Sequence, residues 1–292
     1  MSQEIKTVAV LGTGTMGRGI AHVSALAGYV TQLFDTSAEA LKKAEATIHR
    51  NLAKGVEIGK VEAGAAAAAR ESLHLHESLP GAVAEADLVI EAVPEDMALK
   101  IRTFGEVAGA CPPHALFASN TSALSITEMA AASDRPERFA GMHFFNPVHV
   151  MKLLELVRGL QSSEETLQTM RQVGARMGKE VVLVKEAPGF VTSRINALIG
   201  NEAFRMLQEG VASAEDIDKA LKLGLNHPMG PFEMVDLVGL DVRLSILEYL
   251  HKSLGEAFRP NLILIQHVRA GRLGKKVGRG VYTYTENGEK IG

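Results

Sequence analysis

Over the first 185 residues, short β-rich runs alternate with stretches of helical apolar spacing. The β-rich runs are TVAVLG (7–12), VTQLFD (30–35), ADLVIEAV (86–93), ALFASNTS (115–122), RFAGMHFF (138–145) and EVVLV (180–184). The helical stretches are 15–28, 37–55, 95–110, 124–132 and 164–177, together with an alanine-rich segment, 63–71, because alanine is the best helix former. This alternation predicts an α/β fold, a mostly parallel sheet of the Rossmann type with helices on both faces.

After residue 185 the pattern changes to helices alone. FVTSRINALIGNEAFRMLQEG has helical spacing, SAEDIDKALKLG opens with Ser213 and Asp216 as a capping box, and no convincing strand follows. Because 292 residues are many for one core, we expect two domains, 1–186 and an all-helical 187–292. A long apolar helix at the start of the second domain has surface to cover, which favours a homodimer through that domain.

Composition excludes several classes of protein. The formal net charge of -3 gives no bulk attraction to nucleic acid or to an anionic membrane. The single cysteine, Cys111, excludes an internal disulfide, fits a reducing compartment and is expected to be inert before two prolines. No stretch approaches the roughly 18 apolar residues of a membrane span, and no signal peptide is evident. We therefore expect a cytoplasmic protein that binds neither membrane nor nucleic acid, and no metal at its site.

A glycine-rich turn, GTGTMG, follows the first β-rich run and opens the first helical stretch. In the G-x-G-x-x-G pattern, Gly12 permits a tight turn, Gly14 lets the backbone approach a pyrophosphate and Gly17 lets the helix pack against the strand. Asp35, at the end of the next β-rich run, would bind ribose hydroxyls and repel a 2′-phosphate, so NAD is favoured over NADP. The residues expected to bind this cofactor are Gly12, Gly14, Thr15, Met16, Gly17 and Asp35. The alternatives are a plain glycine turn with Asp35 as a helix cap, and a flavin, which the lack of a second nucleotide signature disfavours.

The segment GMHFFNPVHVMKLLELV (141–157) carries a carboxylate, Glu155, inside an apolar run. A buried carboxylate is costly unless something pairs with it, and His143 can meet it if the intervening loop folds back. A histidine suits the base that takes a hydroxyl proton as hydride leaves, and the carboxylate would orient the imidazole and stabilise its charged form. From spacing alone, a structural histidine and a solvated edge glutamate are as well supported, and His149 is expected in a loop.

Seven stretches of the sequence are highly specific when taken together: GTGTMGRGIA, EAVPED, FASNTSALSITEMA, GMHFFNPVHVMKLLELV, APGFVTSRI, GLNHPMGPFEMVDLVGLD and GRLGKKVGRGVYTY. They resemble the L-3-hydroxyacyl-CoA dehydrogenase family, essentially from end to end, and most of all its short bacterial branch that acts on 3-hydroxybutyryl-CoA. The resemblance implies reversible, NAD-dependent oxidation of (S)-3-hydroxyacyl-CoA to 3-oxoacyl-CoA.

The resemblance also implies roles for particular residues. His143 falls on the family's catalytic histidine and Glu155 on its partner, while Ser122 and Asn146 fall near the reacting oxygen and the nicotinamide. Further cofactor contacts are implied for Glu95, Lys100 and Lys275. Asn51 matches a CoA contact, and Lys54 and Lys60 are nearby cations that could meet CoA phosphates, although exposed lysines are as often merely solvated.

One position departs from the family pattern. Many relatives have an asparagine where GFVTSR places Ser193, one turn into a long helix, so Ser193 would bind the substrate through a shorter side chain, or only bond a backbone carbonyl. The rival functions are action on another 3-hydroxy substrate, such as a dicarboxylic hydroxyacyl-CoA (3-hydroxyadipyl-CoA) or a sugar acid, and a non-catalytic NAD-binding oligomer.

Overall fold

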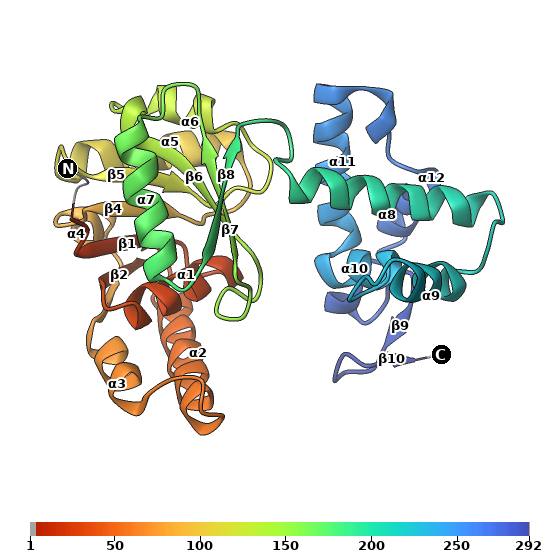
Figure 1. The fold of residues 1–292 in the computed structure, drawn as a ribbon, viewed down its shortest axis with the longest axis horizontal. Coiled ribbons are helices and arrows are strands. Elements are labelled where there is room, and N and C mark those ends of the chain that lie inside the picture. The colour runs from red at the N-terminus through yellow and green to blue at the C-terminus, as the bar shows by residue number, and fades with distance from the viewer. Residues whose placement is uncertain (1–3, 292) are drawn as a thin grey trace. The chain divides into compact units, whose positions relative to one another are not determined.

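The computed structural model describes residues 4–291, whose contacts divide the chain into two compact units, Met1–Ala187 and Pro188–Gly292. The first unit is built on one eight-stranded sheet, with strand order β3-β2-β1-β4-β5-β6-β7-β8 (Figure 1). Its strands are β1 (Thr7–Leu11), β2 (Val30–Phe34), β3 (Leu73–His76), β4 (Leu88–Glu91), β5 (Leu116–Ser119), β6 (Phe139–Phe144), β7 (Leu153–Arg158) and β8 (Glu180–Lys185).

Six of the seven strand pairs are parallel, and only β6 and β7 run antiparallel. The expected Rossmann-type sheet followed by a helical domain is therefore confirmed. The prediction was wrong in two places. It missed β3, a short edge strand in which His74 and His76 alternate with leucines and weaken the apolar pattern. It also extended β5 to residue 122, whereas the strand ends at Ser119 and the next residues form a loop.

The helices of the first unit begin close to the predicted positions. They are α1 (Thr15–Leu26), α2 (Ala38–Glu57), α3 (Ala63–Glu71), α4 (Leu79–Val83), α5 (Met97–Ala110), α6 (Ile126–Ala132) and α7 (Glu164–Arg176), with a 3₁₀ turn at Pro136–Arg138. The alanine-rich segment is α3, as predicted, while the five-residue α4 was not predicted. Side-chain oxygens at the N-caps of four of these helices accept a backbone N–H: Ser37, Asp96, Ser125 and Ser163.

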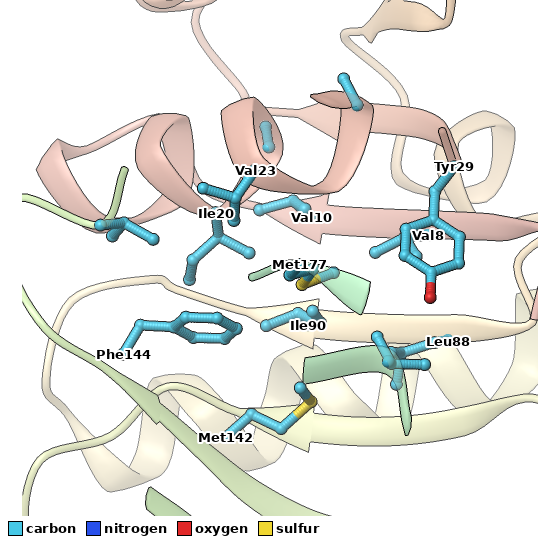
Figure 2. Close-up of a cluster of buried hydrophobic side chains, with 14 of the residues drawn as sticks. Val8, Val10, Ile20, Val23, Tyr29, Leu88, Ile90, Met142, Phe144 and Met177 are labelled. Carbon is cyan, nitrogen blue, oxygen red and sulfur yellow. The ribbon is translucent and has the colours of Figure 1, made fainter. Parts of the chain in front are cut away.

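One face of the sheet packs against α1 and α7. Alternate residues along the central strands point to this face and gather in one layer with side chains of α1 (Figure 2). The labelled members of the layer are Val8, Val10, Ile20, Val23, Tyr29, Leu88, Ile90, Met142, Phe144 and Met177. Because Met142 and Phe144 of β6 both point to this side, the side chain between them, that of His143, points to the opposite face.

The opposite face is covered by α5 and α6. Phe117 of β5 and Phe139 of β6 meet Phe104 of α5, with ring centroids 5.7 and 4.6 Å from the Phe104 ring. His143 follows Phe139 by four residues on the same strand and shares its face, nearer the carboxyl end. His143 therefore lies near the carboxyl end of β6, and ligands of open α/β sheets bind at the carboxyl ends of the strands.

The second unit is mainly helical. Its elements are α8 (Thr192–Gln208), α9 (Ala214–Gly224), α10 (Pro231–Val238), α11 (Leu240–Leu254), α12 (Leu262–Arg269), the 3₁₀ turns Glu256–Phe258 and Lys275–Val277, and two short strands, β9 (Thr283–Tyr284) and β10 (Lys290–Ile291). The strands were not predicted, because a two-residue pair has no periodicity to detect. Ser213 caps α9 as expected, but the Asp216 carboxylate accepts a bond from the Ser213 hydroxyl at 2.9 Å, since aspartate is short for the reciprocal bond of a capping box.

Two buried aspartates tie the C-terminal segment to the second unit's core. Asp236 accepts hydrogen bonds from the backbone N–H groups of Val281 and Tyr282, and Asp218 accepts one from the hydroxyl of Tyr282 at 2.9 Å.

On α11, Arg243 is 2% exposed, and no ion pair or hydrogen bond of its guanidinium is found within residues 4–291. Burial lowers the pKa of Arg243 to about 10. Within residues 4–291, no helix has both the length and the apolar character needed to cross a bilayer.

Candidate active site

The glycine turn lies at the carboxyl end of β1 and leads directly into α1. Gly12 has φ +98°, and a Cβ there would lie 2.8 Å from the carbonyl oxygen of Ala92. A Cβ on Gly17 would lie 1.8 Å from the carbonyl oxygen of Gly12, so the helix approaches the strand more closely than any side chain allows. A Cβ on Gly14 would meet no heavy atom within 4 Å, so the helix N-terminus has open space in front of it. Such a turn fits the pyrophosphate of a dinucleotide.

Asp35 lies directly after β2, beside this turn. One carboxylate oxygen accepts the backbone N–H and the hydroxyl of Thr13, at 3.0 and 2.6 Å, and the other accepts the backbone N–H of Ser37 at 3.1 Å. Ser37 is the N-cap of α2, so the alternative in which Asp35 caps that helix is wrong. The carboxylate is half-buried and held at the edge of the sheet where a bound dinucleotide would place its adenosine ribose.

His143 and Glu155 are directly opposite each other in the antiparallel pair β6–β7. Opposite residues point to the same face, and the imidazole Nδ1 lies 2.7 Å from a carboxylate oxygen of Glu155. The residues are 5% and 1% exposed, which removes water as a competing partner. The alternative of a solvated edge glutamate is wrong, because Glu155 is buried, bonded to the imidazole and on a strand that lies between β6 and β8. A purely structural histidine would make the same bond.

The loop after β5 carries Ser122. Its backbone N–H donates to Glu95 at 2.9 Å, and the hydroxyl of Thr121 donates to the same oxygen at 2.5 Å. Beneath Glu95 lies the ammonium group of Lys100, 3.3 Å from the other carboxylate oxygen of Glu95 and 2.7 Å from Glu91. Glu91 is not among the predicted site residues, although it is a carboxylate inside the apolar run LVIEAV, as Glu155 is inside its own run.

Two neighbouring cavities in the first unit bring further predicted residues together. Asn146, exposed in the loop after β6, lines a cavity of about 140 Å³ with Thr15 of the glycine turn and with Asn51 of α2. Asn51 and His149 also line a second cavity, of about 630 Å³, which Lys54 and Lys60 border as well. His149 lies in the loop, as expected, and its ring is 5.3 Å from that of His22.

The larger cavity has a cationic border. Lys54 pairs with Glu57 at 2.7 Å, and the buried Lys179 donates to the backbone carbonyls of Val148 and Met151. Lys60 and Lys152 also border the cavity. Within residues 4–291 neither of these two lysines has an ion pair, so both ammonium groups are available to an anionic ligand.

The other two predicted residues lie in the helical unit. Ser193 is the second residue of α8, so it lies in the first turn and not one turn into the helix as expected. No carbonyl of that helix lies a full turn before it, and within the described residues its hydroxyl makes no hydrogen bond to a backbone carbonyl. Lys275 begins a 3₁₀ turn, with its ammonium group 5.7 Å from the centre of the Tyr284 ring.

A glycine turn of this kind serves a dinucleotide, and a buried histidine held by a carboxylate serves proton transfer. The two occur together in nicotinamide-dependent dehydrogenases, which must remove a hydroxyl proton as the hydride leaves. Comparison with known proteins narrows this class. The family model of the 3-hydroxyacyl-CoA dehydrogenase NAD binding domain matches residues 7–187 of the sequence. The family model of the 3-hydroxyacyl-CoA dehydrogenase C-terminal domain matches residues 189–284. The chain therefore belongs to the 3-hydroxyacyl-CoA dehydrogenase family, and it is an oxidoreductase whose cofactor is NAD.

Individual relatives are similar along almost the whole chain. A probable 3-hydroxybutyryl-CoA dehydrogenase of Bacillus subtilis is 45% identical over 97% of this chain and 99% of its own length. The crystal structure of the (S)-3-hydroxybutyryl-CoA dehydrogenase of Ralstonia eutropha superposes with a TM-score of 0.93 at 41% identity, covering 97% of this chain and 100% of the other. The 3-hydroxyadipyl-CoA dehydrogenase of Escherichia coli is 41% identical over 100% of this chain, which corresponds to 62% of its own length.

Proposed function

We propose that this protein interconverts a short-chain (S)-3-hydroxyacyl-CoA, above all 3-hydroxybutyryl-CoA, and the corresponding 3-oxoacyl-CoA. In oxidation the substrate loses a hydride from C3 and a proton from its hydroxyl, giving 3-oxoacyl-CoA, NADH and a proton. When bound, NAD supplies the hydride acceptor. His143 takes the hydroxyl proton and returns it in the reverse direction, and Ser122 and Asn146 bind the C3 oxygen.

The observation that carries this proposal is the buried bond between His143 and Glu155. A carboxylate on Nδ1 fixes the tautomer that leaves Nε2 to accept a proton, and it stabilises the imidazolium that forms. The pair favours this proposal over a non-catalytic NAD-binding oligomer, because such an oligomer has no need of a buried histidine bonded to a carboxylate. The same bond orients the ring for the reverse reaction, in which the imidazolium protonates the 3-oxo group.

For the cofactor we propose contacts from the glycine turn, from Asp35 and Glu95, and from Ser122 and Asn146. Residues 1–186 would form the NAD-binding domain, and residues 187–292 the domain for substrate binding and dimerisation, which contributes Lys275 and Ser193. The open space over Gly14 and the anchored carboxylate of Asp35 support this assignment. The expected contact of Lys100 would come from beside Glu95, whose carboxylate lies 3.3 Å from the Lys100 ammonium group.

For CoA we propose the cavity bordered by Asn51, Lys54 and Lys60. The Lys60 ammonium group, which has no ion pair within residues 4–291, is suited to a CoA phosphate, whereas Lys54 would have to exchange its pair with Glu57 for one. We expect Lys60→Ala to raise the KM for the acyl-CoA several-fold and to leave NADH affinity unchanged. Lys43→Ala, which removes an exposed lysine of α2 outside this cavity, is the matched control.

The second candidate substrate is 3-hydroxyadipyl-CoA, which the Escherichia coli relative acts on by name. Steady-state rates with acyl-CoA substrates of increasing chain length, with 3-hydroxyadipyl-CoA, and with NAD against NADP separate the candidates. We expect the highest kcat/KM with 3-hydroxybutyryl-CoA and NAD. A preference for the dicarboxylic substrate would replace the first candidate by the second, and a lack of turnover with every acyl-CoA would end both.

We also infer a cytoplasmic homodimer that functions in fatty acid β-oxidation or butanoate metabolism. Large apolar side chains are exposed on the helical unit, among them Ile195 of α8, Leu237 of α10 and Val242 of α11, and a second copy would cover such a surface. Light scattering coupled to size-exclusion chromatography gives the mass directly, and a monomer at micromolar concentration would contradict this inference.

A further inference from the structure

The proposed reaction gives no role to Glu186, yet its carboxylate accepts three hydrogen bonds from one short segment. The donors are the hydroxyl of Ser125, at 2.5 Å, the backbone N–H of Thr127, at 3.0 Å, and the hydroxyl of Thr127. Glu186 directly follows β8, and its own backbone N–H donates to the carbonyl oxygen of Arg158 at the end of β7, at 2.9 Å. The carboxylate is therefore held at the ends of two paired strands.

Capping of α6 does not require this carboxylate. Ser125 already caps the helix, because its hydroxyl oxygen accepts the backbone N–H of Glu128 at 3.1 Å. The hydroxyl groups of two other cap residues in this unit, Ser37 and Ser163, bond only within their own helices in the described part of the chain. The bond from Ser125 to Glu186 instead spans 61 positions of the sequence and joins α6 to the end of β8 (Figure 1).

Thr127 makes a second connection between α6 and the sheet. Its hydroxyl oxygen accepts the backbone N–H of Leu160, two positions after the end of β7, at 2.9 Å, while its hydroxyl proton is donated to Glu186. The start of α6 is thus bonded to the ends of both β7 and β8. Since β7 carries Glu155 opposite His143, these bonds fix α6 to the strands that hold the proposed acid–base pair.

The loop that leads into α6 carries Ser122 and is restrained along its whole length. The Oδ1 atom of its first residue, Asn120, accepts the backbone N–H of Phe144 at 2.9 Å, and the backbone N–H of Ser122 donates to Glu95 at 2.9 Å. Ser125 lies three positions after Ser122 and is the last residue before α6. Its bond to the carboxylate at the end of β8 therefore restrains the end of the loop.

We propose that Glu186 is a positioning residue for the reaction, which fixes the Ser122 loop relative to the strands that hold His143 and Glu155. This inference rests on the proposed function, in which Ser122 binds the C3 oxygen while His143 moves the proton. These two groups come from different elements, so their relative position depends on the bonds that tie the loop to the strands. Because a displacement of about 1 Å can lower a rate by on the order of 100-fold, such a restraint affects turnover.

The first test compares Glu186→Ala and Ser125→Ala with Ser163→Ala in the full-length protein. Ser163→Ala is the matched control, because it also removes a cap hydroxyl in this unit, that of α7; it should lower the thermal midpoint and leave kcat unchanged. At a temperature where the variants are folded, we expect Glu186→Ala and Ser125→Ala each to lower kcat for 3-hydroxybutyryl-CoA by about tenfold. NADH affinity, measured by fluorescence, should stay within about twofold of the wild type, since the glycine turn and Asp35 follow other strands.

A wild-type kcat in folded Glu186→Ala would show that the carboxylate is only structural and would overturn the proposal. If Glu186→Ala does not fold, Ser125→Ala decides in the same way, because it removes a donor to the carboxylate and keeps Glu186 itself. An equal loss of kcat in Ser163→Ala would also overturn the proposal, since the effect would then follow from helix capping in general.

The second test is a double-mutant cycle with Ser122→Ala. If Glu186 acts through the position of Ser122, adding Glu186→Ala to Ser122→Ala costs less than about twofold more in kcat. Multiplicative losses would mean that Glu186 acts elsewhere, and would overturn this inference while leaving Ser122 in the site. Unchanged kcat in Ser122→Ala itself would instead remove Ser122 from the proposed function, and the inference would fail with it.

Discussion

Replacing the carboxylate of Glu155 by an amide is the most direct perturbation of the proposed acid–base pair. Glu155→Gln keeps the size of the side chain and the strand pairing, and it removes only the charge that faces the imidazole at 2.7 Å. Hydrogen bonds to charged groups contribute about 1.5–3 kcal/mol, and this bond is shielded from water because both residues are at most 5% exposed. If that energy is available mainly when the imidazolium forms, kcat falls by about 10- to 150-fold.

The decrease in kcat is measured in the steady-state oxidation of 3-hydroxybutyryl-CoA, followed by NADH absorbance. The affinity for NADH should stay the same. His143→Gln should cost more, on the order of 10²- to 10⁴-fold in kcat, as expected for a general base. Adding Glu155→Gln to His143→Gln should then cost almost nothing further, because the carboxylate acts only through the ring. A double variant whose loss equals the product of the two single losses would refute the reasoning.

Four other outcomes follow from the structure. Asp35→Ala should narrow the preference for NADH over NADPH in direct binding titrations, and equal affinities in the wild type would contradict the role of Asp35. Ser193→Ala should cost about 1 kcal/mol of transition-state stabilisation in kcat/KM, while Ser193→Asn is tolerated; normal turnover of the alanine variant would remove this residue from the site. Burial lowers the pKa of His22 from 6.5 to about 4, so the unfolded chain takes up this proton first and stability falls as pH drops from about 6.5 towards 4. Between pH 7 and 5 this loss is about 2 kcal/mol, and His22→Leu should lose less stability than the wild type over that interval in denaturant titrations. Arg243→Met should leave the thermal midpoint unchanged or raise it, because the buried guanidinium lacks a partner among the described residues; a large decrease would reveal an acceptor from outside them.

Much of the fold could be predicted because the first unit repeats one pattern. Buried parallel strands such as LVIE and LFAS are apolar runs that end in one polar residue, and caps such as Ser37 and Ser125 mark where helices begin. The pattern failed at β3, which is a polar edge strand. It also failed to end β5 at Ser119, although the polar run SNTS is a loop signal. The strand ends where Asn120 and Thr121 turn towards β6 and Glu95.

The candidate site was predictable where its residues conflict with their surroundings. Glu155 is conspicuous among leucines, and periodicity places His143 on the preceding strand. Lys100 is different, since on a helix a lysine is expected at the surface, and only the fold shows that Glu91 lies within 2.7 Å of it. Whether Lys60 and Lys152 border one cavity is likewise a property of three-dimensional packing and not of spacing.

The antiparallel ladder between β6 and β7 has a consequence for redesign of this protein. The distance between His143 and Glu155 is set by the ladder, so the connecting residues 145–152 do not determine it. Substitutions, or even insertions, in that connection could reshape the cavities it borders and leave the acid–base pair intact. A shift of β7 by a single residue would instead turn Glu155 to the other face of the sheet and leave both groups buried without each other. Library designs for new substrates should therefore vary the connection, apart from Asn146, and keep both strands fixed.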